Sequence, residues 1–156
     1  MTNEEIVRDF FEAFGRRDHA AMARHYGPDA AFEDPVFGKL IAGQIAQMWK
    51  MLCQRGKDLK IELLSCHVDG DECTAEWEAT YTFSQTGRFV RNRVRSVFSL
   101  RNGKIAQQND HFNFWKWSSQ ALGMPGRALG WTPLIKNAVR KNAKRSLETY
   151  ERPNHG

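Results

Sequence analysis

Two aspartates are the residues of this chain whose surroundings favour chemistry. Asp34 lies in the segment AFEDPVFG, between an aromatic residue and a proline, and Asp110 lies in NDHFNF, beside two phenylalanines. A carboxylate among apolar side chains resists ionisation, and a second carboxylate nearby adds to that resistance. If the two share a cavity, one should keep its proton near neutral pH while the other is charged. Such a pair could abstract and return a proton on a small carbonyl compound, enol or epoxide.

Each aspartate also has a purely structural interpretation. Asp before Pro is a common turn residue whose side chain accepts hydrogen bonds from the backbone that follows it, as Asp34 could do before Pro35. Asp110 could be buried against a helix N-terminus or a polar neighbour. The sequence leaves these alternatives open, because they differ in whether the two carboxylates meet in one cavity.

The first part of the chain has helical periodicity. Thr2 and Glu5 have the spacing of a capping box, and the apolar residues that follow recur at helical intervals. Asp18 is a suitable N-cap for a second helix, which Pro28 must end. The predicted elements are helices over 2–16, 18–26 and 44–55, an extended piece at 30–34 and a loop at 35–43.

The middle of the chain changes to the two-residue period of strands. The predicted strands are LKIELLSCHVD, ECTAEWEATYTFS, RFVRNRVRSVFSL and KIAQQNDHFNFWKW. Their short joints, of which Asn102-Gly103 is the strongest hairpin signal, predict an antiparallel meander. Helices followed by a run of strands indicate an α+β fold with helices packed on one face of a curved sheet.

Strand alternation assigns each side chain to a face of this sheet. One face is apolar and aromatic, with Asn92, Ser96, Gln108 and Asp110 as its polar exceptions. The other face carries a row of glutamates at 72, 76 and 78 beside a row of arginines at 91, 93 and 95. These rows predict a cross-strand charge ladder on the outer surface, either solvated or in an interface.

The order of these elements, with FEDPV before four long strands, resembles the nuclear transport factor 2-like superfamily over residues 3–117. This superfamily includes SnoaL-like polyketide cyclases, ketosteroid isomerase, limonene epoxide hydrolase and scytalone dehydratase. The resemblance implies a curved antiparallel sheet that forms a cone around three N-terminal helices. A C-terminal helical extension completes the predicted fold.

Tyr26 followed by Glu-Asp-Pro is similar to the segment that carries the general base of ketosteroid isomerase. The resemblance therefore implies Asp34 as a base, with Tyr26 in support. The two oxyanion donors of that isomerase correspond to Phe10 and Ser96 here, which argues against authentic steroid isomerisation.

The segment NDHF is similar to the last strand of epoxide hydrolases and SnoaL-like cyclases, where it carries a catalytic aspartate. The resemblance implies that role for Asp110. The hydrolase also uses an arginine and an aspartate on the second long strand. Glu76 and Glu78 stand there in this chain, so the full hydrolase triad is absent.

We therefore predict a cofactor-independent acid–base enzyme of the isomerase, cyclase or dehydratase type, with Asp34 and Asp110 catalytic. The alternative is a non-catalytic ligand-binding or dimeric assembly domain. His25 is a further candidate for orienting substrate. The side chains predicted to contact a small hydrophobic ligand are Phe10, Phe14, Tyr26, Trp49, Trp77, Tyr81, Asn92, Ser96, Phe98, Gln108 and Phe112.

The chain is predicted to form one domain, with a cone over 1–117 and a connection and basic helix over 118–156. Residues 118–130 are predicted to be a flexible connection with a helical turn at 118–122. The helix is predicted over 131–150, with Thr132 as N-cap and Pro133 at its first position. Trp115 and Trp117 are predicted to share a face of the last strand.

Charge and composition indicate which binding partners and which cellular compartment to expect. The net charge of +5 is concentrated between Lys136 and Arg152, without a nucleic-acid motif or a bulky apolar stripe, so neither nucleic acid nor a membrane is an expected partner. The first residues have no apolar signal segment, and the three cysteines have no metal-ligand spacing. We expect a cytoplasmic protein with reduced thiols and with neither metal nor cofactor, forming a homodimer through the outer face of the sheet.

Overall fold

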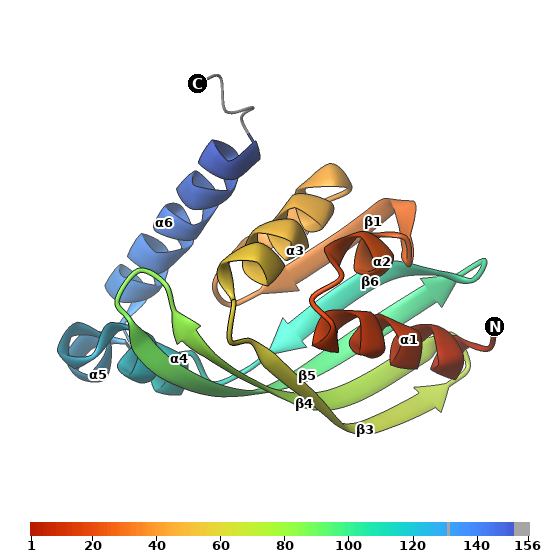
Figure 1. Cartoon of the computed structure of the whole chain (residues 1–156), viewed down its shortest axis with the longest axis horizontal. Helices are drawn as coiled ribbons and strands as arrows, with labels where there is room; N and C mark the ends of the chain where they lie inside the picture. The colour runs from red at the N-terminus through yellow and green to blue at the C-terminus, as the bar shows by residue number, and fades with distance from the viewer. Residues whose placement is uncertain (131, 152–156) are drawn as a thin grey trace.

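Six strands form one curved sheet that does not close on itself (Figure 1). The computed structural model describes residues 1–130 and 132–151. The strands are β1 (Tyr26–Asp34), β2 (Gly38–Ile41), β3 (Lys60–Asp69), β4 (Glu72–Phe83), β5 (Arg88–Arg101) and β6 (Lys104–His111). Their order across the sheet is β2-β1-β6-β5-β4-β3. The prediction of an α+β fold built on a curved sheet is confirmed.

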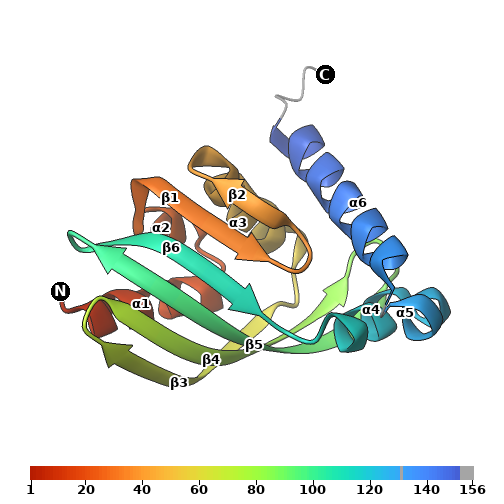
Figure 2. The ribbon, with the colours of Figure 1, turned by 180° about the vertical axis from the view of Figure 1, so that it is seen from behind.

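Helices cover the concave face of the sheet and one of its ends (Figures 1 and 2). The helices are α1 (Asn3–Gly15), α2 (His19–Ala23), α3 (Gly43–Arg55), α4 (Phe114–Leu122), α5 (Met124–Leu129) and α6 (Pro133–Glu151). The first three lie inside the curve of the sheet. Helices α4 and α5 form a compact pair after β6, and α6 leads from them past α3.

Aromatic side chains of α1 form the centre of the core. Phe10 is fully buried, and its ring makes edge contacts with Trp49 of α3 and Phe98 of β5 at centroid distances of 5.9 and 5.8 Å. Phe14 approaches Trp77 of β4 in the same way, at 5.4 Å. Because edge-to-face contacts are favourable beyond the apolar area that they bury, this cluster fixes α1 and α3 against the sheet.

The four long strands pair as predicted, but the sheet is not a pure meander. Strands β3 to β6 are antiparallel neighbours, and Asn102 and Gly103 both have positive φ in the β5–β6 turn. Strand β1, however, pairs in parallel with β6. It enters the sheet after α2 has returned the chain to the same end, so the mixed sheet is a correction to the predicted antiparallel one.

Two predicted boundaries near Asp34 are also wrong. The second helix ends at Ala23 and not at Tyr26, because Tyr26 already pairs with Ile105 of β6. The predicted loop at 35–43 contains β2, which folds back on β1 with Asp34 opposite Gly38. Asp34 thus occupies a tight turn between two paired strands.

The segment predicted as the end of the last strand is helical. Strand β6 ends at His111, and Asn113 caps α4 by accepting a hydrogen bond from the Lys116 amide at 3.0 Å. Helical spacing separates the two tryptophans that were predicted to share a face. Trp117 is buried, whereas Trp115 is 41% exposed.

The helical turn predicted at 118–122 is confirmed as the end of α4, but the rest of the predicted flexible connection contains α5. Helix α6 begins at Pro133 as predicted, but the Thr132 hydroxyl donates to the Leu129 carbonyl at 2.6 Å and does not cap it. Ala143 and Leu147 of α6 are buried in the main core. The predicted first residue of this helix, Trp131, lies outside the described residues. Within the described part of the chain, no helix is long and apolar enough to cross a membrane.

The outer face of the sheet carries the predicted charge rows. Glu76 stands opposite Arg95 and Glu78 opposite Arg93, and the ion pairs form on the diagonals, with Arg93 to Glu76 at 3.5 Å. Cys53, Cys66 and Cys73 are free thiols, and the Cys66 and Cys73 sulfurs form a hydrogen bond at 3.3 Å.

A glycine allows α5 to approach α4 closely. A Cβ placed on Gly126 would lie 2.0 Å from the Ser118 carbonyl oxygen. We predict that Gly126→Ala lowers the free energy of unfolding by about 2 kcal/mol or more, because backbone atoms cannot yield as a flexible side chain can. Urea unfolding measures this change. Gly43→Ala in α3 is the matched control, since a Cβ there meets nothing within 4 Å. Equal stability of the two variants would contradict the close packing of α4 and α5.

Candidate functional site

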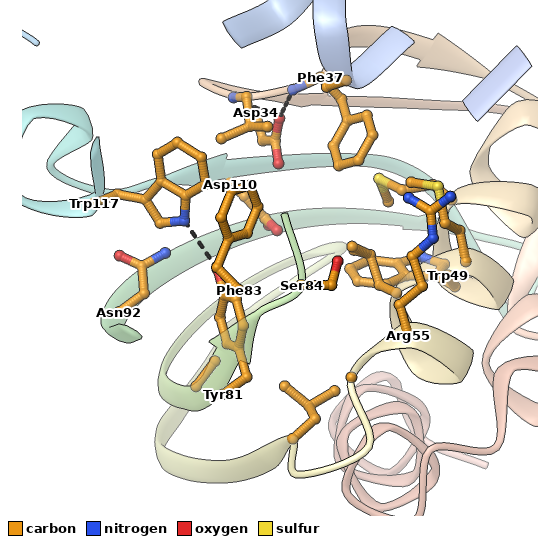
Figure 3. Close-up of a pocket in the computed structure, with 18 of the residues that line it drawn as sticks. Asp34, Phe37, Trp49, Arg55, Tyr81, Phe83, Ser84, Asn92, Asp110 and Trp117 are labelled. Atoms are coloured by element: carbon orange, nitrogen blue, oxygen red, sulfur yellow. Dashed lines mark hydrogen bonds between the residues drawn. The ribbon is translucent and has the colours of Figure 1, made fainter. Parts of the chain in front are cut away.

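A cavity of about 180 Å³ lies between α3, α6 and the inner face of the sheet (Figure 3). Its wall is mostly aromatic and aliphatic, and Asp34 and Asp110 both contribute to it. A space of this size holds several water molecules or a small organic molecule. The two aspartates singled out from the sequence therefore line one cavity, although they come from β1 and β6.

Asp34 is both a turn residue and a wall residue. One of its carboxylate oxygens, Oδ1, accepts hydrogen bonds from the backbone amides of Val36 at 2.9 Å and Phe37 at 2.5 Å. These are the contacts expected of Asp before Pro. The other oxygen points into the cavity (Figure 3). Arg140 of α6 donates to the Pro35 carbonyl at 3.2 Å, which brings a positive charge close to the turn.

Asp110 is held by two polar residues of the sheet. Its Oδ1 accepts a hydrogen bond from the Ser96 hydroxyl at 2.5 Å and one from the Gln108 amide nitrogen at 3.0 Å. Ser96 and Gln108 are fully buried. The second oxygen of Asp110 makes no hydrogen bond to the described residues, and the side chain faces the cavity. The structural interpretation, a carboxylate paired with polar neighbours, is thus correct for one oxygen only.

Two tryptophans determine the direction of these hydrogen bonds. The Trp77 indole donates to the Ser96 hydroxyl at 2.8 Å, and the Trp49 indole donates to the Tyr26 hydroxyl at 2.9 Å. Tyr26 in turn donates to the Gln108 carbonyl oxygen. An indole N–H can only donate, so each hydroxyl must pass its own proton onward. Both chains therefore end as donors to the same carboxylate oxygen.

Burial raises the pKa of both carboxyl groups. The pKa of Asp34 rises to about 7, chiefly because of desolvation, with a further increase from the negative charge of Asp110. The pKa of Asp110 rises to about 6, also through desolvation, and the hydrogen bonds from Ser96 and Gln108 limit the increase. Both carboxyl groups are therefore harder to ionise than an exposed aspartate.

The structure places six of the predicted ligand-contacting residues in the cavity wall: Phe14, Trp49, Trp77, Tyr81, Asn92 and Phe112. The other five are not among the residues of the wall: Phe10, Tyr26, Ser96, Phe98 and Gln108. Phe10 and Phe98 belong to the core, whereas the three polar residues lie in the hydrogen-bond chains behind Asp110.

Other candidate residues from the sequence lie outside the cavity. His25, a candidate for orienting substrate, instead pairs with Asp9 of α1 at 2.6 Å. Glu76 and Glu78 lie on the outer face of β4, so they cannot complete a hydrolase triad in the cavity. No group of three or more potential metal ligands occurs in the described ranges 1–130 and 132–151.

Sequence analysis missed several contributions to the wall. Trp117 reaches the cavity from α4, and its helical spacing from Phe114 after the capping Asn113 is the signal that could have revealed this. Helix α6 adds side chains at positions 139, 142, 143 and 146. Arg55, at the end of α3, also lines the cavity and lies over the ring of Tyr150 at 5.4 Å.

Solved structures show the same fold at low sequence identity. A protein with a ketosteroid isomerase-like fold from Catenulispora acidiphila DSM 44928, in complex with trimethylamine, matches with a TM-score of 0.70 and 18% identity, covering 85% of this chain and 100% of that one. A candidate polyketide cyclase from Pseudomonas putida KT2440 matches with a TM-score of 0.66 and 19% identity, covering 78% and 98%. An LEH-like epoxide hydrolase from M. tuberculosis matches with a TM-score of 0.65 and 19% identity, covering 77% and 89%.

Among curated proteins, none matches this chain significantly. The family model of the SnoaL-like domain matches residues 7–108, a range that includes most of α1, all of α2 and α3, β1 to β5 and most of β6. This match and the shared fold confirm the predicted resemblance, and the chain belongs to the SnoaL-like domain family.

Proposed function

We propose that this protein is a cofactor-independent acid–base enzyme acting on a small hydrophobic molecule in the aromatic-walled cavity. The observation that carries the proposal is the arrangement of Asp34 and Asp110. Each has Oδ1 occupied by two donors, each lines the cavity, and the second oxygen of each accepts no hydrogen bond from the described residues. The structural relatives named as a polyketide cyclase and an epoxide hydrolase support a role in small-molecule chemistry.

The hydrogen bonds assign the reactive atom of each carboxyl group. An oxygen that accepts two hydrogen bonds has no lone pair left for a proton, so a proton on either aspartate belongs on Oδ2. We assign Asp110 as the carboxylate base, because the donor chains through Ser96 and Gln108 stabilise its ionised form, and Asp34 as the group that holds a proton. This assignment reverses the roles that the isomerase resemblance implied, in which Asp34 was the base.

The proposed reaction moves one proton at each aspartate. Oδ2 of Asp110 takes a proton from a carbon next to a carbonyl, and the electron pair of that bond forms the enolate. Oδ2 of Asp34 gives its proton to the substrate oxygen or to a second carbon. The same two transfers serve isomerisation, cyclisation and dehydration, which differ in the substrate bound.

The first test follows the carboxyl groups and a model reaction. In protein with ¹³C-labelled aspartates, NMR titration should give carboxyl midpoints near pH 6 for Asp110 and near pH 7 for Asp34. Deuteration of 2-tetralone next to its carbonyl in D₂O should be accelerated most between these midpoints, since one group must be ionised and the other protonated. Asp110→Asn should slow that exchange roughly 100-fold or more.

The control for this test is Glu33→Gln, which removes an exposed carboxylate next to Asp34 in the chain. It should leave the exchange rate unchanged. Midpoints near 4 for both aspartates would contradict the proposal. Raised midpoints without exchange on any tested ketone would favour the alternative, a domain that binds a ligand without converting it.

The second test uses protein stability. The pKa of Asp34 is higher in the folded state than its ordinary value of 3.8 in the unfolded chain, so the folded state binds more protons between these values. The stabilisation that protonated Asp34 contributes to the folded state is fully present below pH 4 and is lost as the pH rises through 7. We predict that Asp34→Asn, measured against wild type by urea unfolding, gains on the order of 2–4 kcal/mol at pH 8 relative to pH 5. Glu33→Gln should gain nothing; an equal gain in both variants would show that the effect is not specific to the cavity.

The outer face of the sheet is the surface proposed for a homodimer. Its rows of glutamates and arginines are self-complementary, so a copy related by two-fold symmetry can place its arginine row against the glutamate row of the first. Phe89, which is 58% exposed, adds an apolar contact at one end of β5. We predict a dimer in analytical ultracentrifugation that Arg93→Glu shifts toward monomer, while Lys57→Glu, outside this face, does not. A monomeric wild type would refute the dimer.

A further inference from the structure

The cavity has a further polar group that the two aspartates do not account for. Removing a proton beside a carbonyl places negative charge on the carbonyl oxygen, and that charge requires a hydrogen-bond donor. The position that corresponds to the first-helix donor of ketosteroid isomerase is Phe10, which is fully buried in the core. A donor must therefore come from another part of the wall.

Tyr81 has a hydroxyl group whose proton is available to the cavity. Tyr81 lies on the inner face of β4 and lines the cavity. Its oxygen accepts a hydrogen bond from the Trp117 indole at 2.8 Å (Figure 3). Because the indole cannot accept, the proton of Tyr81 must point elsewhere. No described residue accepts it, so the cavity is the direction left for it.

Trp117 fixes the position of this hydroxyl. The indole is buried and packs edge-on against Phe83 at a centroid distance of 5.5 Å. Its helix, α4, is capped by Asn113 and contacts β5. An oxygen that already accepts from a fixed donor has a restricted range of O–H directions, which is the preorganisation that stabilises developing charge.

The surroundings also keep Tyr81 protonated. Burial raises the pKa of Tyr81 to about 12, and the negative charge of Asp34 contributes to the increase. The hydroxyl therefore remains a donor throughout the pH range in which the aspartates titrate. The influence of Asp34 also indicates that the two groups are near each other in the wall.

We propose that Tyr81 donates a hydrogen bond to the substrate oxygen that becomes negative, and that Trp117 is the positioning residue for this donor. The inference deepens the proposed function and rests on it. The substrate class is an apolar molecule with one carbonyl or enol oxygen that reaches both β4 and the carboxylates. Tyr81 keeps its proton throughout: Asp110 takes the proton from carbon, the electron pair moves onto oxygen, and the proton returned to the substrate comes from Asp34.

The test uses 4-nitrophenol, whose ionised form mimics the enolate and absorbs visible light. In the wild-type complex Asp110 should take the phenol proton, so bound nitrophenol should be ionised at a lower pH than free nitrophenol. Tyr81→Phe should weaken nitrophenolate binding roughly 10- to 100-fold, the usual effect of a hydrogen bond to a charged group. Binding of 4-nitroanisole, which cannot ionise and accepts only a weak hydrogen bond, should weaken much less.

Further variants separate a positioning role from loss of folding. Trp117→Phe should lower the ionised fraction of bound nitrophenol while 4-nitroanisole still binds. Incorporation of 3-fluorotyrosine at position 81 keeps the hydrogen bond to Trp117 and makes the hydroxyl a stronger donor, so nitrophenolate should bind at least as tightly as in wild type. Tyr150→Phe, which removes a phenol outside the cavity wall, is the control and should behave as wild type.

The outcomes distinguish this inference from the proposed function. If Asp110→Asn slows deuterium exchange of 2-tetralone but Tyr81→Phe leaves nitrophenolate affinity and ionised fraction unchanged, the role of Tyr81 is refuted and the aspartate pair is not. If neither Asp110→Asn nor Asp34→Asn changes the exchange rate, the proposed function fails. A wild-type protein that does not bind nitrophenol in ionised form also overturns the inference.

Discussion

The hydrogen bonds that converge on one oxygen of Asp110 are the interaction on which the interior of this sheet depends. Trp49 and Trp77 begin two chains of donors, and neither chain can run backward because an indole has no acceptor. Ser96 and Gln108 would be costly to bury without partners, yet no buried side-chain nitrogen or oxygen in the described chain lacks one. The carboxylate of Asp110 is what satisfies them, so the acid proposed as the base also stabilises the polar part of the core.

Asp34 is held in a similar way, with two hydrogen bonds to one of its oxygens. The backbone after Pro35 directs two amides at one oxygen of Asp34, which is why a turn residue and a cavity residue are the same residue. The turn interpretation and the cavity interpretation of Asp34 compete when only the sequence is known. In the structure, the first describes Oδ1 and the second describes the other oxygen of the same side chain. The tight turn fixes the first oxygen and thereby aims the second.

Sequence periodicity predicted the four long strands and their inner and outer faces, because alternation and hairpin turns are local properties. Local sequence also singled out both aspartates as candidates. It failed where long-range pairing decides the outcome. Tyr26 joins a strand because β6 offers it a partner, and nothing next to Tyr26 in the chain contains that information. The segment after His111 was assigned to a strand because its aromatic residues alternate, although Asn113 is a helix cap. Because of that assignment, Trp117 was not predicted to be part of the candidate site.

The parallel pairing of β1 with β6 has a consequence for the order in which the molecule assembles. Tyr26 and Gln108 are separated by 82 residues, whereas β3 to β6 connect through short turns. Joining β1 to β6 therefore closes the longest loop in the sheet and incurs the largest loss of chain entropy, which slows folding. Asp34 and Asp110 lie on these two strands, so a nascent chain has no site until the ribosome has delivered β6. A folding intermediate that contains only the hairpins would be well structured but would not yet have the two aspartates in one cavity.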